Sequence, residues 1–236
     1  MKITVLGTGG GARAHIARLA GLGHEVHVGT RDPKVTLART GPDPMGTPPF
    51  KDFLAQHPGI QLHTFGEAAA ASDGLVINGI DGHNAVAALS AIADPLAGKT
   101  LADYAVPYIY NPDIERPWPT PWGVNPILDP CDSDSLGEQI QRALPHTKVV
   151  KAFVTQEQET VTDPKSIGGE HTMFIAGDDD AAKQQVTDLL KTYGWDDVLD
   201  LGPLVAARGM EMYAHMHLAI GLALGFGTRF GIKVVR

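Results

Sequence analysis

Four glycines separate an apolar run from a helical pattern in ITVLGTGGGARAHIARLA, at residues 3–20. Gly7, Gly9 and Ala12 occupy the small-residue positions of the pattern G-x-G-x-x-G/A. The first such position permits a tight turn, the second leaves room for a pyrophosphate, and the third lets the helix pack on the strand. Amides at the helix start then point at the phosphates. We therefore predict dinucleotide contacts from Gly7, Thr8, Gly9, Gly10, Gly11 and Ala12, with Gly10 and Gly11 adding backbone freedom.

The end of the second apolar run discriminates between the two nicotinamide dinucleotides. A site for NAD places Asp or Glu there to hold the ribose hydroxyls, whereas this chain has Thr30 and Arg31 after Gly29. A guanidinium makes bidentate charged contacts with a phosphate, and Lys34 adds positive charge nearby. Asp32 lies one residue beyond the position from which an acidic side chain would hold the ribose, and we interpret it as turn-forming. The sequence therefore predicts NADP(H), held through Thr30, Arg31 and Lys34.

A fourth apolar run ends in VINGIDGH, at residues 76–83. Ligands of open α/β sheets lie across the carboxyl ends of the strands. We therefore expect Asn78, Gly79 and Ile80 to lie along the cofactor, with His83 opening the next helix.

The elements that must position these residues alternate between strands and helices. Strands are expected at 2–7, 24–31, 60–65, 74–80 and 99–106, with helices between them at 12–23, 50–58, 66–72 and 84–93. Such alternation implies right-handed crossovers and a parallel sheet covered on both faces. The predicted fold class is α/β: a Rossmann-type, mostly parallel sheet with helices on both faces, plus a smaller α/β C-terminal region ending in a long helix.

The second half of the chain begins after a proline-rich stretch. Residues 107–130 hold seven prolines and two of the three tryptophans, which indicates a structured loop that either covers a site or is a surface excursion. Beyond it, strands are expected at 148–155, 171–177 and 196–202, and helices at 132–144, 178–194 and 203–225. The last helix is apolar on most faces, which favours burial against a second subunit. We predict an NADP-binding domain at 1–130 and a substrate and dimerisation region at 131–236.

Composition limits the classes of function. The net charge of −8 argues against a general nucleic-acid binder, which needs a basic face. No apolar run approaches the length of a membrane-spanning helix, so no membrane partner is expected. The single cysteine, Cys131, excludes an internal disulfide and favours a cytoplasmic location. The expected partners are a small-molecule hydride acceptor or donor and a second copy of the chain.

Several longer segments carry a family resemblance. They are GTGG (7–10), GTRDP (29–33), DSLGEQIQRALP (134–145), VVKAF (149–153), AARGMEMY (206–213) and FGIKVVR (230–236). In these segments the chain resembles the NADPH-dependent reductases of the deazaflavin coenzyme F-420, and more closely their bacterial relatives. The resemblance implies a Rossmann domain, a smaller C-terminal part, a dimer, and hydride exchange between NADP(H) and F-420 or another acceptor.

The chain departs from the pattern of that family at two strand ends. Val106, in DYAVP, and Val154, in KAFVT, stand where its members usually have asparagine. An amide can hold a ring carbonyl or a carboxamide, whereas valine can only pack. Both positions are expected to face the nicotinamide, so Val106 is included among the predicted cofactor contacts.

No side chain is assigned as catalytic. Hydride transfer between a nicotinamide and a deazaflavin needs stacked rings and exclusion of water rather than a general acid. A carbonyl or imine reductase would need a proton donor, for which the candidates are Tyr104, Tyr108, Tyr110, His83 and Lys151. A reductase of flavins or ferric complexes, and a non-catalytic NADP(H)-binding redox sensor, also remain open.

The last helix offers a possible metal pair. Glu211 and His215 stand four residues apart and His217 follows, but no HExxH or cysteine cluster accompanies them. Polar packing of the helix is the favoured interpretation, and no metal site is predicted.

Overall fold

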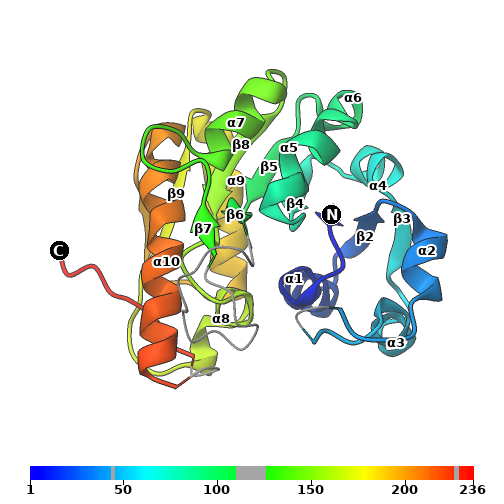
Figure 1. Cartoon of the computed structure of the whole chain (residues 1–236), viewed down its shortest axis with the longest axis horizontal. Helices are drawn as coiled ribbons and strands as arrows, with labels where there is room; N and C mark the ends of the chain where they lie inside the picture. The colour runs from blue at the N-terminus through cyan, green and yellow to red at the C-terminus, as the bar shows by residue number, and fades with distance from the viewer. Residues whose placement is uncertain (44–45, 110–125, 226–228) are drawn as a thin grey trace.

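The computed structural model describes residues 1–43, 46–109, 126–225 and 229–236. Its main sheet has eight strands in the order β10-β9-β8-β5-β4-β1-β2-β3 (Figure 1). Neighbouring strands run parallel except for β8 and β9, which are antiparallel. The strands are β1 (Lys2–Leu6), β2 (Glu25–Thr30), β3 (Gln61–Thr64), β4 (Leu75–Asn78), β5 (Thr100–Asp103), β8 (Lys148–Ala152), β9 (Met173–Gly177) and β10 (Val198–Asp200).

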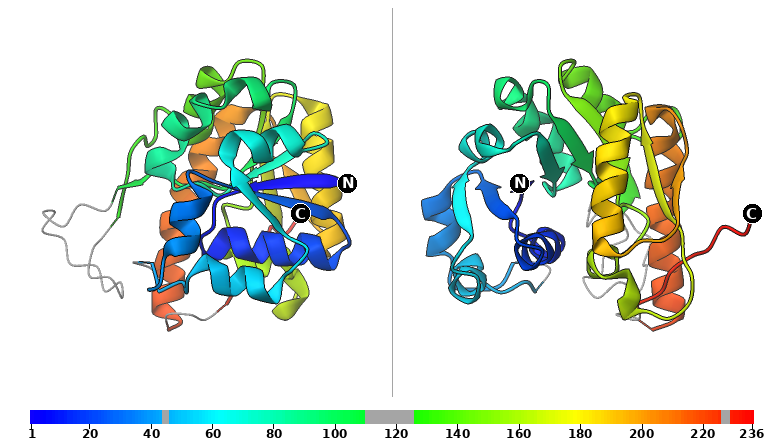
Figure 2. Two further views of the ribbon diagram at one scale, coloured as in Figure 1. Left: turned by 90° about the vertical axis from the view of Figure 1, so that its right-hand side faces the viewer. Right: turned by 180° about the vertical axis from the view of Figure 1, so that it is seen from behind.

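Helices cover both faces of this sheet (Figure 2). One face packs against α1 (Gly10–Gly21), α3 (Phe50–Gln56) and α9 (Asp180–Tyr193), through a core that includes Ile16, Phe50 and Val186. The other face packs against α4 (Phe65–Ala71), α5 (Gly82–Ser90) and α7 (Leu136–Ala143). The long α10 (Ala207–Ala223) lies on α7. The predicted fold class is therefore confirmed.

Side-chain caps explain where several helices begin. Asp32 caps α2 (Pro33–Ala38) by accepting from the amides of Lys34 and Val35, and Pro33 follows as the first helical residue. Thr64 caps α4 through a capping box with Glu67. Ser135 caps α7 by accepting from the amide of Glu138. The turn-forming role expected of Asp32 is thus a helix cap.

Short elements complete the described chain. They are α6 (Ala93–Leu96), α8 (Gln158–Thr162), two 3-10 turns (Pro164–Ser166 and Leu204–Ala206), and the antiparallel pair β6 (Tyr108–Ile109) and β7 (Ile127–Leu128).

Every predicted strand is present, but some helix predictions need correction. The helix predicted from residue 203 begins at Ala207, because a 3-10 turn over Leu204–Ala206 precedes it. The sequence missed α2 and α8, which have six and five residues and are too short to show a period.

The fold does not test two predictions, the proline-rich loop and the division into two domains. Residues 110–125 of the predicted proline-rich loop lie outside the described residues. The sheet continues from β5 to β8, across the predicted boundary at residue 130, so the two-part division stays a prediction. No helix among the described residues combines the length and the apolar character that crossing a bilayer requires.

Candidate functional site

The glycine-rich turn lies at the carboxyl end of β1, against the end of β4. Gly7 has φ +122°, a conformation that L side chains rarely adopt, and a Cβ there would collide with the carbonyl oxygen of Gly79. The amide of Gly7 donates to the carbonyl of Gly29 at 2.9 Å, and the amide of Gly79 donates to that of Leu6 at 2.7 Å. The backbone conformation expected at Gly7 is therefore present.

Open space lies over the start of α1. A Cβ built on Gly9 would meet no atom of the described residues within 4 Å, and Gly9 itself has φ −72° and ψ 177°, an ordinary extended conformation. No side chain caps this helix, so its first amides are available to an anion. The small residue at position 9 thus leaves room for a ligand rather than for another part of the described chain.

Gly11 and Ala12 serve packing instead. A Cβ on Gly11 would lie 2.9 Å from Cγ of Gln158 and 3.2 Å from the hydroxyl of Tyr104. Gly10 and Gly11 lie within α1 without positive φ, so the backbone freedom expected of them is not used here. Ala12 is buried in the core between helix and sheet, as the pattern implied.

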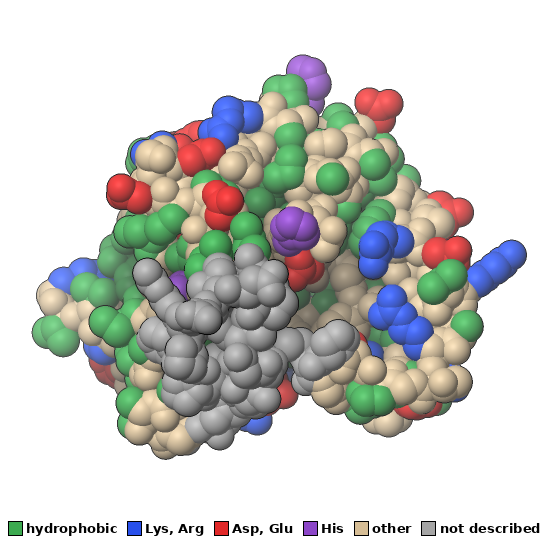
Figure 3. Space-filling model, viewed as in Figure 1, with side chains coloured by type: hydrophobic (Ala, Val, Ile, Leu, Met, Phe, Trp, Pro, Cys, Tyr) green, Lys and Arg blue, Asp and Glu red, His purple; other side chains and the backbone are tan. Residues whose placement is uncertain are grey.

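A cleft of about 440 Å³ opens above this turn. Figure 3 shows a hollow in this face of the molecule, with Lys and Arg side chains gathered beside it over α2. The cleft is lined by Gly7, Thr8, Gly9, Gly10, Thr30, Arg31, Asp32, Val35, Thr36, Arg39, Asp43, Thr47, Phe65, Gly79, Ile80, Asp81, Asn84 and Ala88.

Eight of the thirteen predicted contact residues line this cleft: Gly7, Thr8, Gly9, Gly10, Thr30, Arg31, Gly79 and Ile80. The other five, Gly11, Ala12, Lys34, Asn78 and Val106, do not line it. Lys34 is exposed on α2, and Val106 packs beside Val154, Ala176 and Met210.

The sequence missed a second arginine at this corner. Arg39 ends α2 and lines the cleft together with Arg31. Thr36, also missed, is buried and shares a 2.8 Å hydrogen bond with the hydroxyl of Thr30. The signal that could have revealed both is Asp32–Pro33, since a capping residue followed by proline predicts a helix start.

Arg13 holds the turn and the loop before α3 together. Its Nε donates to the carbonyl of Thr8 at 2.9 Å, and its Nη2 donates to the carbonyl of Pro48 at 2.6 Å. The guanidinium also lies over the rings of Phe50 and Phe53. The wall of the cleft is thereby fixed to α1.

Beneath the cleft, a chain of buried polar groups joins four elements. The Asn78 amide nitrogen donates to Asp103 at 2.7 Å, and the Asn78 oxygen accepts from the amide of Ile80 at 3.1 Å. The ammonium of Lys151 lies 2.7 Å from Asp103 and 2.8 Å from Glu211. Asn78, expected along the cofactor, is therefore buried below the cleft, where it shapes the turn that carries Gly79 and Ile80.

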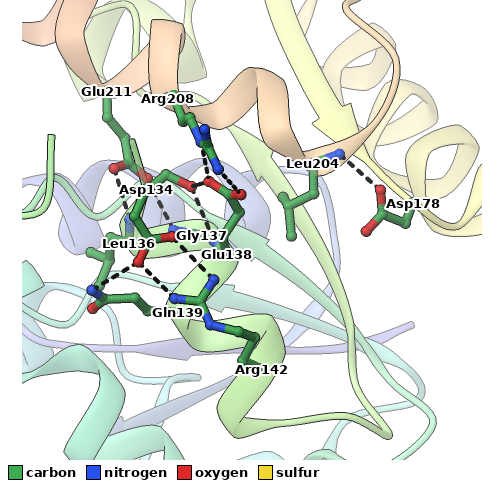
Figure 4. Close-up of polar contacts among 11 residues, drawn as sticks. Asp134, Leu136, Gly137, Glu138, Gln139, Arg142, Asp178, Leu204, Arg208 and Glu211 are labelled. Carbon is green, nitrogen blue, oxygen red and sulfur yellow. Dashed lines mark hydrogen bonds and ion pairs between the residues drawn. The ribbon is translucent and has the colours of Figure 1, made fainter. Parts of the chain in front are cut away.

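Glu211 also caps a helix (Figure 4). Its two carboxylate oxygens accept from the amides of Leu136 and Gly137, at 2.9 and 3.0 Å, at the start of α7. Favourable interaction with the positive end of the helix dipole accompanies these bonds. Of the interpretations considered for Glu211, polar packing of the last helix is the one that these contacts support.

The candidate proton donors are dispersed. Lys151 is fully buried in the ion-pair network, and Tyr104 stacks on His15 with ring centroids 5.4 Å apart. Burial raises the pKa of Tyr104 well above its ordinary value. Tyr108 lies against His215, with ring centroids 5.6 Å apart. His83 lies in the first turn of α5, and Tyr110 lies outside the described residues.

His15 connects α1 to the second half of the chain. Its Nε2 lies 2.8 Å from Oε1 of Gln158, and its Nδ1 lies 3.1 Å from the hydroxyl of Tyr193. An amide oxygen only accepts, so His15 carries its proton on Nε2 and Tyr193 donates to Nδ1. Burial lowers the pKa of His15 from 6.5 to about 4, against a smaller opposing effect of the Gln158 hydrogen bond.

This buried neutral histidine predicts acid sensitivity. Below pH 6.5 the unfolded chain protonates at His15 while the folded chain does not, so stability falls as pH drops toward about 4. Between about pH 7.5 and pH 5 the wild type should lose about 2 kcal/mol more than His15→Gln, measured by urea unfolding. Equal losses in the two proteins would show that His15 does not cause this sensitivity.

Comparison with known proteins places the chain in a family. No protein-family model matches the sequence. A protein from Arthrobacter sp. FB24, described with its crystal structure as a putative F-420-dependent NADP reductase, is 43% identical over 100% of both chains, with a TM-score of 0.90.

More distant proteins share parts of the sequence or the fold. The metalloreductase STEAP3 of Rattus norvegicus is 29% identical over 211 residues, and this chain spans 36% of its length. An imine reductase from Myxococcus stipitatus in complex with NADP+ has a TM-score of 0.59 at 15% identity, with 94% of this chain and 63% of that chain covered. The last likeness concerns the fold alone. Because the chain is 43% identical to the Arthrobacter protein over the whole length of both, it belongs to the family of the F-420-dependent NADP reductases, which are NADP-dependent oxidoreductases.

Proposed function

We propose that the protein transfers a hydride between NADP(H) and coenzyme F-420. The single observation that carries the proposal is the open space over Gly9, which lies in one cleft with Arg31 and Arg39. A pyrophosphate fits where only glycine leaves room, and a 2′-phosphate fits beside two guanidinium groups. When bound, NADPH supplies the hydride.

The residues of the chain divide into three roles in this proposal. The turn residues Gly7, Thr8, Gly9 and Gly10 surround the pyrophosphate, while Gly79 and Ile80 lie along the rest of the cofactor. Thr30, Arg31 and Arg39 surround the 2′-phosphate, and Lys34 contributes charge from outside the cleft. Gly11, Ala12 and Asn78 position these residues, and Val106 packs near the nicotinamide together with Val154.

Arg31 should select for the phosphorylated cofactor. Arg31→Ala is expected to weaken NADPH binding by about 10- to 100-fold, the effect of removing a charge-assisted pair, while NADH binding changes little. Fluorescence titration with both nucleotides measures the two affinities. Lys34→Ala is the matched control, because this exposed cation does not line the cleft, and it should lower NADPH affinity less than Arg31→Ala. An equal loss for NADPH and NADH in Arg31→Ala would contradict the assignment.

A panel of acceptors tests the reaction itself. NADPH oxidation, followed by absorbance, is compared with F-420, a free flavin, a ferric chelate and a cyclic imine. Turnover with F-420 alone supports the proposal. Turnover with another acceptor would replace F-420 by that compound, and tight NADPH binding without any turnover would favour a redox sensor.

The oligomeric state and domain roles are part of the same proposal. α10 and its flanks expose large apolar side chains, among them Val205, Met212, Met216 and Leu224, and a homodimer would cover them. We assign NADP(H) binding to residues 1–130, acceptor binding and dimerisation to residues 131–236, and a cytoplasmic location to the protein. Sedimentation at a monomeric mass would contradict the dimer.

A further inference from the structure

A buried side-chain amide in the second half of the chain has no hydrogen-bond partner among the described residues. Gln156 is only 3% exposed, yet neither its Oε1 nor its Nε2 has a partner within the part of the chain that the structure describes. A buried polar group left unpaired costs free energy, and such groups are rare in folded proteins. The amide of Gln156 therefore calls for an explanation beyond packing.

The backbone around Gln156 is also unusual. Phe153, at the carboxyl end of β8, has φ +65°, a left-handed conformation that is strained for a residue with a side chain. Gln158 holds the loop in this shape, because its amide nitrogen donates to the carbonyls of Phe153 at 2.9 Å and Gln156 at 3.3 Å. Strained backbone of this kind concentrates at functional sites.

The loop lies against the start of α1. Cγ of Gln158 comes within 2.9 Å of the position that a Cβ on Gly11 would take, and α8 packs along α1. Two residues span at most about 7 Å of chain, so Gln156 stays close to this contact. Ligands of open α/β sheets bind at this edge, outside the carboxyl ends of the strands.

The neighbours of Gln156 do not satisfy its amide. Val154 packs against Ala176 and Met210, and the hydroxyl of Thr160, fully buried on α8, has no partner among the described residues either. Two unpaired polar groups thus occur in one short segment next to the proposed cofactor site.

Given the proposed function, we propose that Gln156 is a specificity-determining residue that hydrogen-bonds a group presenting a carbonyl beside an N–H. Its Oε1 accepts from the N–H and its Nε2 donates to the carbonyl. Two sources offer this chemistry in the reaction: the carboxamide of the nicotinamide and the imide edge of a deazaflavin or flavin ring. Binding by either source gives the buried amide the partners that it lacks within the chain.

The decisive variant is Gln156→Met, which keeps the size of the side chain and removes its hydrogen bonds. We expect its melting temperature to equal or exceed that of the wild type, because removing an unpaired buried amide relieves a desolvation cost. Gln141→Met is the matched control. Gln141 donates to the carbonyls of Leu144 and Thr147 and accepts from the amide of Val149, so its loss should lower the melting temperature and leave ligand affinity unchanged.

Two ligand measurements distinguish the sources. If Gln156 binds the carboxamide, Gln156→Met lowers the affinity for NADP+ by about 5- to 20-fold. The variant then also loses the preference of the wild type for NADP+ over its 3-acetylpyridine analogue, which lacks the N–H. If Gln156 binds the acceptor, affinity for NADP+ is unchanged and KM for F-420 rises by a similar factor.

Other outcomes overturn the proposal. Unchanged NADP+ affinity, analogue preference and KM in Gln156→Met would do so while leaving the proposed function intact. A lowered melting temperature with unchanged ligand affinity would assign Gln156 to folding alone. Absence of NADPH binding by the wild type would instead overturn the proposed function, and this inference with it.

Discussion

Replacing Lys151 with methionine is expected to lower the free energy of unfolding by about 3–5 kcal/mol, the cost of leaving buried carboxylates without their cation. Lys151 is fully buried, and its ammonium donates to Asp103, Glu211 and the carbonyl of Ala105. Burial opposes the charge, but the two carboxylates outweigh this effect and raise the pKa of Lys151. Methionine fills a similar volume without any donor. Urea unfolding near neutral pH measures the difference.

An exposed ion pair provides the control. The ammonium of Lys191 lies 3.8 Å from Asp188 on α9, and both side chains are 62% exposed. Lys191→Met should change the free energy of unfolding by no more than about 0.5 kcal/mol, because solvent screens such pairs. Equal stability of the two variants would show that the buried network does not hold α10 to the sheet.

The succession of strands and helices along the chain could be predicted from sequence because the signals are local. Each strand of the parallel sheet is a short apolar run. The longer crossover helices show a helical period of apolar residues or are bounded by glycine or proline. Gly7, Gly9 and Ala12 lie six residues or fewer apart, so their spacing encodes the turn directly. The same holds for Thr30, the last residue of β2, and for Arg31, which follows it.

Long-range pairing could not be predicted in this way. Lys151 was a candidate proton donor and Glu211 a candidate metal ligand, because each was considered with its neighbours along the chain. The structure brings them within 2.8 Å although sixty positions separate them, and pairs Lys151 with Asp103 as well. Only the packing of α10 on α7 and β9 creates this contact.

Arg39 and Asn78 show the same limit of local sequence signals at the candidate site. Arg39 lines the cleft from the end of α2, and a helix of six residues leaves no periodic signal. The position of Asn78 at a strand end predicts a side chain along the cofactor. Its side chain instead points to Asp103, since a buried carboxylate needs hydrogen-bond donors and the amide supplies one.

The cofactor site can be tested independently of the fold by replacing Gly9 with valine. Gly9 has ordinary backbone angles, and within the described part of the chain no atom lies within 4 Å of its would-be Cβ, so a side chain can begin there without a backbone clash. We expect the melting temperature to change little. The valine would occupy the position proposed for the pyrophosphate and lower NADPH affinity by about 100-fold or more, equivalent to about 2.7 kcal/mol. Thermal unfolding and fluorescence titration of one preparation measure both effects.

Gly21→Val is the matched control for this variant. Gly21 is the last residue of α1, also lacks atoms within 4 Å of its would-be Cβ, and lies about 16 Å along the helix from Gly10. Gly9 precedes the first residue of α1 and Gly21 is its last residue, so neither valine lies in the interior of the helix, but only the one at position 9 meets the ligand. NADPH should therefore bind Gly21→Val as it binds the wild type. Unchanged NADPH affinity in Gly9→Val would mean that the dinucleotide does not cross the start of α1. The proposed function would then fail, because it depends on the open space over Gly9.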